Sequence, residues 1–187
     1  MSSDPAHHER RDLEEIVDHI RDKETSIIIQ KLTDDPSWIH CIDSISSWSL
    51  IKYAIFDGNE ELFDYLLKNM QHDVVPLDAI EETSLEPTLM FCVRNGSLYM
   101  LNKVIEKFQN VNFQTRDTKI TSLHAAVHHH YQSSDRNKRV KLLLKSGADK
   151  RLRDLSGYMP IHYIGQDYKL KNIFLKYGNR PEDEIPN

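Results

Sequence analysis

Histidines and paired carboxylates are the side chains of this sequence that could support chemistry. Three histidines are consecutive at His128-His129-His130, and adjacent carboxylates occur at Asp34-Asp35, Glu60-Glu61 and Glu81-Glu82. Successive residues of a helix point about 100° apart, so three neighbouring histidines cannot easily converge on one metal ion. No cysteine or carboxylate stands near them at the spacing of zinc ligands. We therefore predict a polar segment here, sensitive to pH because histidine titrates near neutrality, and no metal site.

The sequence carries no signature of an enzyme active site. It lacks a glycine-rich phosphate loop, a Gly-x-Ser-x-Gly elbow and a His-Glu-x-x-His pair, and it contains only 6 glycines for the tight loops that nucleotide sites need. Acid–base catalysis would require the carboxylate pairs to lie in a desolvated pocket, which nothing in the sequence indicates. We predict that the protein is not an enzyme and has no catalytic residue, cofactor or small-molecule substrate. The enzymatic alternative is catalysis at the histidine segment, which would require stoichiometric metal.

The elements around these residues read as pairs of helices joined by turns. Within residues 147–162, Gly147 can end one helix in the left-handed conformation. Residues 154–157 (Asp-Leu-Ser-Gly) can then form a tight turn. Pro160 suits the first position of the next helix, because its missing N–H would have no helical partner there. This stretch therefore predicts a joint between two helical units.

A second motif shows that the joint belongs to a repeat. Residues 121–126 (Thr-Ser-Leu-His-Ala-Ala) differ from the Thr-Pro-Leu-His-x-Ala signature of ankyrin repeats only at Ser122, and Pro160-Ile161-His162 is a shorter match. The threonine of the motif can cap the helix, its leucine can anchor the core, and its last alanine lets a second helix approach. The sequence thus resembles the ankyrin-repeat family. That resemblance implies structural roles for His124 and His162, whose rings would tie neighbouring turns together.

Two weaker copies of the helix pair lie upstream, at residues 51–67 and 89–105. Each has a short helix, a glycine break and a longer helix. The four apolar anchors are 38, 34 and 38 residues apart, near the ankyrin period of about 33 residues, and they are Ile51, Leu89, Leu123 and Ile161. In the third interval an insertion falls near residues 128–134. An elongated loop of this kind often carries function.

The predicted fold is an all-α ankyrin-repeat solenoid, folded as one domain over residues 11–179. An amino-terminal helical cap, made of two helices without the signature, occupies about 11–46. Four repeats follow, at about 47–80, 81–112, 113–149 and 150–179. Residues 1–10 and 180–187 are predicted to be flexible ends.

Composition and termini predict an intracellular protein without membrane contact. No run approaches the roughly 18 apolar residues of a membrane span, and the start lacks the layout of a secretory signal. The two cysteines, Cys41 and Cys92, are too few for a disulfide framework. Cys92 falls on a small-residue helix position and is predicted to be a buried free thiol. We expect the protein in the cytoplasm, the nucleus or both.

The family resemblance also implies where a partner would bind. In ankyrin proteins the turn tips and the exposed ends of the short inner helices form a concave recognition face. The corresponding helix ends here carry Phe56, Asp57, Arg94, Asn95, His128 and His129. The corresponding turn tips carry Glu82, Glu86, Arg116, Thr118, Arg153, Leu155 and Tyr158. Phe56 and Tyr158 would be aromatic anchors, since aromatic residues are enriched at binding hot spots.

These features favour a non-enzymatic adaptor, inhibitor or regulatory subunit that binds a protein partner such as a kinase complex or a transcription factor. The chain is similar in size to the ankyrin-type inhibitors of NF-κB factors and of cyclin-dependent kinases. The Asp-Ser-Gly-x-x-Ser degradation signal of the NF-κB inhibitors is missing. A virus- or parasite-encoded protein that targets a host fits the sequence about as well.

Charge divides the chain and supplies an alternative. Residues 1–90 hold 20 acidic and 7 basic side chains, a net charge of −13, whereas residues 91–187 hold 9 and 17, a net charge of +8. The basic half could bind nucleic acid or another polyanion. The residues concerned are Lys138, Arg139, Lys141, Lys145, Lys150, Arg151 and Arg153. Base-stacking aromatics are not interleaved with them, so nucleic acid is the less favoured partner.

Overall fold

The computed structural model describes residues 5–43, 45–70, 87–107, 110–128 and 135–177, with side chains from Leu13 onward. Over these ranges the chain is helical, and its one isolated β-bridge joins Ile42 and Ser49. The Cα positions separate into two compact units, Met1–Ser84 and Leu85–Asn187. In the described ranges, no helix combines the length and the apolar character needed to span a bilayer.

The amino-terminal unit begins with a helix pair, α1 (Pro5–Arg21) and α2 (Thr25–Asp34). Their apolar stripes are buried, through Ile16, Val17, Ile20, Ile28 and Leu32. Both helices were predicted from this spacing of apolar residues, and both are confirmed. The first begins earlier than predicted, since Pro5 lies within the segment 1–10 that was expected to be flexible. Proline is compatible with the first turn of a helix, and no breaker follows it before Arg21.

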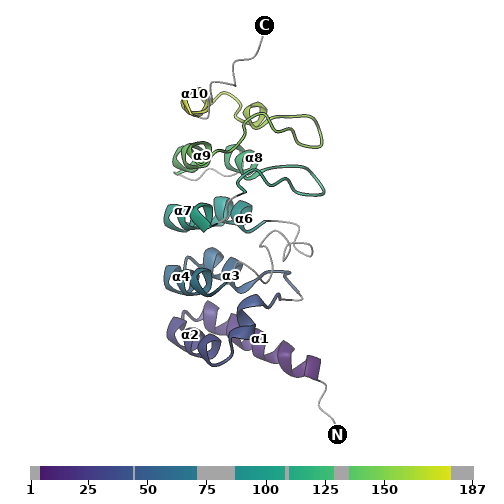
Figure 1. Cartoon of the computed structure of the whole chain (residues 1–187), viewed down its shortest axis with the longest axis vertical. Coiled ribbons are helices and arrows are strands. Elements are labelled where there is room, and N and C mark those ends of the chain that lie inside the picture. Colours follow the sequence, from purple (N-terminus) through teal and green to yellow (C-terminus); the bar gives the residue numbers. More distant parts are fainter. Residues whose placement is uncertain (1–4, 44, 71–86, 108–109, 129–134, 178–187) are drawn as a thin grey trace. The chain divides into compact units, whose positions relative to one another are not determined.

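A second pair follows in this unit, after a short 3-10 helix, η1 (Pro36–His40). The pair consists of α3 (Leu50–Asp57) and α4 (Glu60–Asn69), as the weaker sequence copy predicted. Gly58, at a φ of 68°, ends α3 in the left-handed conformation. Asn59 then caps α4 and donates from Nδ2 to the Thr25 hydroxyl at 2.7 Å. Helix α1 packs against α3, and α2 packs against α4 (Figure 1).

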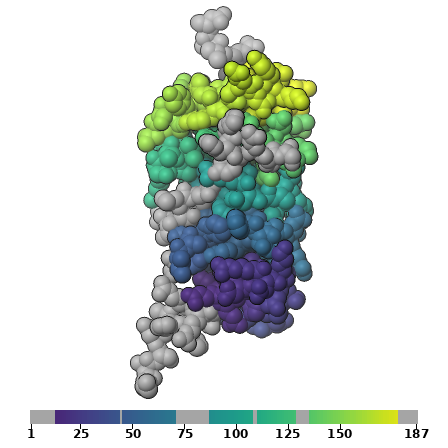
Figure 2. Space-filling view, turned by 180° about the vertical axis from the view of Figure 1, so that it is seen from behind, coloured from purple at the N-terminus to yellow at the C-terminus, as the bar shows by residue number. Residues whose placement is uncertain are grey.

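In the carboxy-terminal unit, the described residues form three further helix pairs. They are α6 (Thr88–Asn95) with α7 (Leu98–Lys107), α8 (Ser122–Val127) with α9 (Arg136–Lys145), and the 3-10 helix η2 (Pro160–Tyr163) with α10 (Tyr168–Lys176). Helices α6, α8 and η2 follow one another in an inner layer, and α7, α9 and α10 follow one another in an outer layer (Figure 1). Within this unit, Figure 2 shows consecutive segments as successive bands. This is the repeated helix pair that the motif spacing predicted.

The predicted anchors of this unit are buried, except the last. Leu89 and Leu123 lie in the core, and Cys92 is a buried free thiol whose burial raises its pKa to about 12. Ile161 is only partly buried, and η2 is a 3-10 helix where an α-helix was predicted. The reason is local, because Gly165 adopts a φ of 65° and leaves η2 too short for two α-helical turns.

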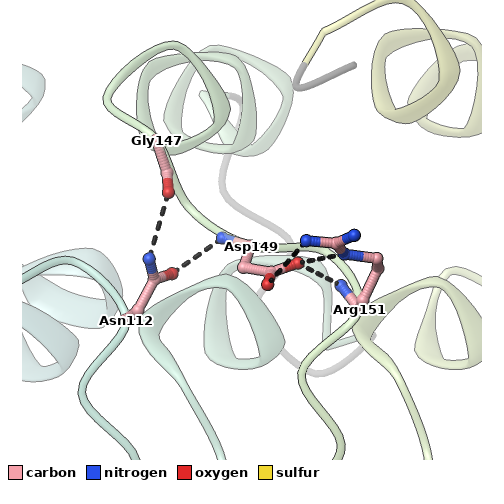
Figure 3. A network of polar contacts seen from close by, with 4 residues as sticks. All are labelled: Asn112, Gly147, Asp149 and Arg151. Carbon is pink, nitrogen blue, oxygen red and sulfur yellow. Dashed lines mark hydrogen bonds and ion pairs between the residues drawn. The ribbon is translucent and has the colours of Figure 1, made fainter. Parts of the chain in front are cut away.

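An asparagine joins two consecutive repeats in the carboxy-terminal unit (Figure 3). The Asn112 side chain accepts a hydrogen bond from the Asp149 backbone N–H at 2.7 Å and donates to the Gly147 carbonyl at 3.1 Å. The Asp149 carboxylate accepts hydrogen bonds from the backbone and guanidinium of Arg151. Gly147 has a φ of 90°, as predicted for a residue that ends a helix. The loop after α7 is thereby fixed to the loop after α9.

Two arginines of α9 close the ends of inner helices. The last carbonyls of an α-helix have no partner within the helix itself. Arg139 supplies donors at the end of α6, to the carbonyls of Val93 and Gly96 at 3.1 and 2.6 Å and to that of Cys92 at 3.2 Å, which also accepts from the Gly96 N–H at 2.9 Å. Arg136 donates to the final carbonyl of α8 at 2.8 Å. Each helix end is therefore completed by a side chain from an outer helix.

Candidate functional site

Two long turns project from the inner layer of the carboxy-terminal unit (Figure 1). Residues 113–120 lead into α8, and residues 150–159 lead into η2. The backbone N–H of Leu155 donates to the Thr118 carbonyl at 2.8 Å. The Gln114 side-chain amide donates to the Arg153 carbonyl at 2.8 Å. These two hydrogen bonds hold the turns side by side.

Five of the predicted partner-binding residues lie on these turns, and we call them the turn surface. They are Arg116, Thr118, Arg153, Leu155 and Tyr158. All five are exposed, with 73% of Leu155 and 52% of Tyr158 accessible to solvent. The structure thus brings together residues from two separate repeats on neighbouring turns.

The second turn is fixed by a buried carboxylate. Asp154 accepts hydrogen bonds from the Tyr158 backbone N–H at 2.9 Å and from the Tyr163 hydroxyl. Burial raises the pKa of Asp154, but these hydrogen bonds outweigh it and hold the pKa below its ordinary value. The same bond to Asp154 raises the pKa of Tyr163 to about 12. Arg153 is held as well, since its guanidinium donates to the Gly157 carbonyl at 2.7 Å.

His124 connects this turn to the preceding repeat. Its Nδ1 accepts a hydrogen bond from the Thr121 backbone N–H at 3.1 Å, so its Nε2 carries the proton and donates to the Tyr158 carbonyl at 3.1 Å. The structural role predicted for His124 is confirmed. His162, in the last copy of the motif, is exposed and bonds only within its own turn, where Nδ1 accepts from the Met159 N–H at 2.9 Å. Among the described residues, no further turn follows whose carbonyl could accept a hydrogen bond from the His162 Nε2.

The predicted partner-binding residues at the helix ends of this unit differ in their exposure to solvent. Arg94 is half-buried, whereas Asn95 is exposed and donates to the Phe91 carbonyl at 3.1 Å. His128 is half-buried, with its ring centroid 5.5 Å from that of Tyr163. His129 lies outside the described residues, as does most of the predicted insertion at 128–134.

The amino-terminal unit holds the remaining predicted residues. Phe56 is 62% exposed at the end of α3, and its ring lies 5.2 Å from the ring of Trp48. Asp57 is half-buried beside it in sequence. Glu82 and Glu86 lie outside the described residues. Phe56, which was predicted to be an aromatic anchor, therefore lies on the surface of this unit.

The basic residues proposed for polyanion binding are largely engaged within the unit. Arg139, named among them from the sequence, is only 9% exposed, so that part of the prediction is wrong. The ammonium groups of Lys141 and Lys145 lie 5.0 and 5.8 Å from the centre of the Tyr177 ring. The capping role of Arg139 was missed, because one arginine in a run of six residues with four positive charges carries no distinguishing signal.

Metal and catalytic chemistry have no support among the described side chains. No group of three or more histidine, cysteine, aspartate or glutamate side chains in these ranges is placed to hold a metal ion. His129 and His130 fall outside these ranges. The arrangement of the turn surface, an exposed leucine and tyrosine flanked by arginines, is instead suited to contact with another macromolecule.

Comparisons with known proteins agree with the repeat architecture. No protein-family model matches the chain, and no curated protein matches it. Among solved structures, the crystal structure of EF0377, an ankyrin repeat protein, is similar to it with a TM-score of 0.72 and 25% sequence identity. The similarity covers 87% of this chain and 79% of EF0377. Together with the signature at residues 121–126 and the repeated helix pairs, this likeness shows that the chain has the fold of an ankyrin-repeat solenoid.

Proposed function

We propose that this protein is a non-enzymatic binding module whose turn surface contacts a protein partner. The observation that carries the proposal is the exposure of Leu155 and Tyr158 on a turn that is held by the buried Asp154 carboxylate. The partner would be organised or blocked by this contact, so that the chain acts as an adaptor, an inhibitor or a regulatory subunit. A kinase complex or a transcription factor is the class of partner that the family resemblance favours.

The chemistry of the turn surface supports this use. Large exposed apolar side chains flanked by arginines resemble the composition of interface hot spots, which are enriched in tyrosine and arginine. Arg153 is already fixed by its bond to Gly157 at 2.7 Å, so binding would cost it less side-chain entropy. The hydrogen bonds between the two turns likewise reduce the backbone entropy that would be lost on binding. The surface is therefore ordered before any partner arrives.

We also propose that the protein acts inside the cell, in the cytoplasm or the nucleus. No disulfide joins Cys41 and Cys92, the two cysteines of the chain. Cysteines outside disulfides are typical of compartments where thiols are kept reduced.

The test is affinity capture from cells that contain the protein, followed by quantitative mass spectrometry. The double variant Arg153→Ala/Tyr158→Ala should lose at least about tenfold in affinity for the captured partner, because two hot-spot side chains contribute about 2 kcal/mol or more. Its helical circular dichroism and melting temperature should stay close to those of the parent.

A matched control lies on α10, where Tyr168 is 75% exposed and Lys171 lies 5.9 Å from its ring centre. The variant Tyr168→Ala/Lys171→Ala also removes one aromatic and one basic side chain, and it should keep the partner. If both variants capture the partner equally well, the partner uses another surface.

A further inference from the structure

A second candidate surface lies in the amino-terminal unit and is made of other residues than the turn surface. A pocket of about 370 Å³ is formed by α1, the loop before α3 and α3 itself. Its apolar lining comes from Leu13 and Val17 of α1, from Ile45 of the loop and from the ring of Tyr53. Ile45 is 80% exposed, so its side chain stands at the edge of the pocket and not in the core.

The loop that carries Ile45 is held in place by one carboxylate. Asp43 accepts hydrogen bonds from the Ile45 backbone N–H at 2.9 Å, from the Ser46 hydroxyl at 2.7 Å and from the Tyr53 hydroxyl at 2.5 Å. The Asp43 backbone N–H donates to the Trp48 carbonyl at 2.9 Å. An apolar side chain presented on a fixed loop loses little entropy on binding, which is the property of a binding anchor.

Aromatic rings extend the pocket into a continuous surface. The Trp48 ring centroid lies 5.2 Å from that of Tyr53, which lines the pocket, and 5.2 Å from that of Phe56. Phe56 is 62% exposed at the far end of this row. We call Ile45, Trp48, Tyr53 and Phe56, with the pocket beside them, the aromatic patch.

The charge at the pocket is negative. Glu14 and Asp18 of α1 line it together with Asp43, and Arg21 is the one basic side chain that the described residues contribute to the lining. Arg21 is paired with Asp18 at 3.0 Å. Glu14 is exposed. The pocket therefore offers carboxylate to a ligand, within a segment, residues 1–90, whose net charge is −13.

We propose that the aromatic patch binds a protein segment in which an arginine stands beside an apolar residue. The apolar residue would contact Ile45 and Phe56, and the guanidinium would lie against the aromatic rings and pair with Glu14. Arginine fits better than lysine, because its planar guanidinium stacks on aromatic faces and bonds carboxylates in two places. This binding does not depend on the turn surface, and the two surfaces would engage different chemistry.

The test uses the full chain and the blocked peptide acetyl-Ala-Leu-Arg-Phe-Ala-amide, followed by chemical-shift mapping in solution. The peptide should shift the backbone signals of residues 45–56 and 13–21. The same peptide with glutamine in place of arginine should bind about five- to thirtyfold more weakly, because it loses an ion pair and a cation–π contact. Raising the salt concentration should weaken the arginine peptide and not the glutamine peptide.

Variants of the protein assign the contact. Ile45→Ala/Phe56→Ala should weaken the arginine peptide about tenfold or more, and Glu14→Gln about two- to fivefold. The matched controls are Ile27→Ala, which removes an exposed isoleucine of α2, and Glu61→Gln, which removes an exposed carboxylate of α4; both should bind as the parent does. Arg153→Ala/Tyr158→Ala should also bind normally, so that failure of the turn surface and failure of the aromatic patch are distinguishable.

Four results would overturn the proposal. The first is that the backbone signals of residues 45–56 do not shift at millimolar peptide, and the second is equal affinity for the arginine and glutamine peptides. The third is that Ile27→Ala loses as much affinity for the arginine peptide as Ile45→Ala/Phe56→Ala. The fourth is that signals of the patch shift with protein concentration in the absence of peptide. The last result would mean that a second copy of the chain occupies the patch.

Discussion

Arg139 shows how a charged side chain can be structural in this fold. It is nearly buried, yet its guanidinium faces three carbonyls at the end of α6. A cation at this place also interacts favourably with the negative end of the helix dipole. The guanidinium therefore replaces the water that would otherwise bond these carbonyls.

We predict that Arg139→Met lowers the free energy of unfolding by about 2–4 kcal/mol. Methionine retains most of the volume but leaves the carbonyls of α6 without their charged donor, and hydrogen bonds to charged groups contribute about 1.5–3 kcal/mol each. Urea unfolding followed by circular dichroism measures the change. The neighbouring Lys138→Met is the control, since Lys138 is exposed and pairs only with Asp135 at 2.8 Å, and it should change stability by less than about 1 kcal/mol. Equal effects of the two substitutions would contradict the capping role.

At the scale of the element, the histidines in two copies of one motif form different hydrogen bonds. In α8 the Thr121 and His124 side chains form a capping box. The Nε2 of His124 also donates a hydrogen bond to the Tyr158 carbonyl of the next turn. In η2 the corresponding residues are Met159 and His162, and within the described part of the chain the histidine bonds Met159 alone. A histidine of this motif therefore links repeats only where a following turn supplies the carbonyl.

This difference marks the limit of what the sequence could predict. The signature at residues 121–126, the spacing of the anchors and the glycine at 147 predicted the helix pairs and their turns correctly. The shortness of η2 depends on the left-handed Gly165, and the exposure of Ile161 depends on the position of η2 at the end of the described repeats. Neither is visible in a motif of three residues. The turn surface was predicted because its residues follow the register, whereas the pocket beside Ile45 joins segments that no repeat relates.

The buried His124 makes the stability of this element depend on pH. Burial lowers the pKa of His124 below its ordinary 6.5, and this outweighs the Tyr158 carbonyl and the Asp154 carboxylate, which favour the charged ring. The unfolded chain therefore takes up a proton near pH 6.5 that the folded chain does not. The free energy of unfolding is therefore highest above that pH. It decreases as the pH falls below it, with a slope of up to about 1.4 kcal/mol per pH unit.

We predict that His124→Gln removes this part of the pH dependence. Urea midpoints measured between pH 7.5 and 5.5 should fall less steeply in the variant than in the parent, although the variant is less stable at pH 7.5. His162→Gln is the control, because its ring is exposed, and it should retain the slope of the parent. A parent slope that persists in His124→Gln would assign the effect to another group.

At the scale of the whole molecule, the division of charge suits two kinds of partner. The acidic residues 1–90 include the aromatic patch, and the basic residues 91–187 include the turn surface with its two arginines. Charge of either sign speeds the encounter with a partner segment of the opposite sign. The two surfaces would then select partner segments of opposite charge.

The basic half is not expected to bind nucleic acid tightly. The clustered basic side chains are engaged inside the carboxy-terminal unit, among them Lys138, Arg139, Lys141, Lys145, Arg151 and Arg153. We predict that a duplex DNA of about 20 base pairs binds the chain more weakly than about 1 μM at about 150 mM salt, in the range of non-specific binding. Fluorescence anisotropy measures this. Tighter binding that weakens steeply between about 50 and 200 mM salt would instead favour a polyanion-binding function.

The position of Arg139 also bears on how the protein is made. Arg139 follows Gly96, whose carbonyl it bonds, by 43 residues. At about 5–20 residues per second, a ribosome adds those residues in about 2–9 seconds. Until Arg139 has been added, the carbonyls at the end of α6 lack this donor. The second repeat of the chain is therefore finished only after most of the third has been translated.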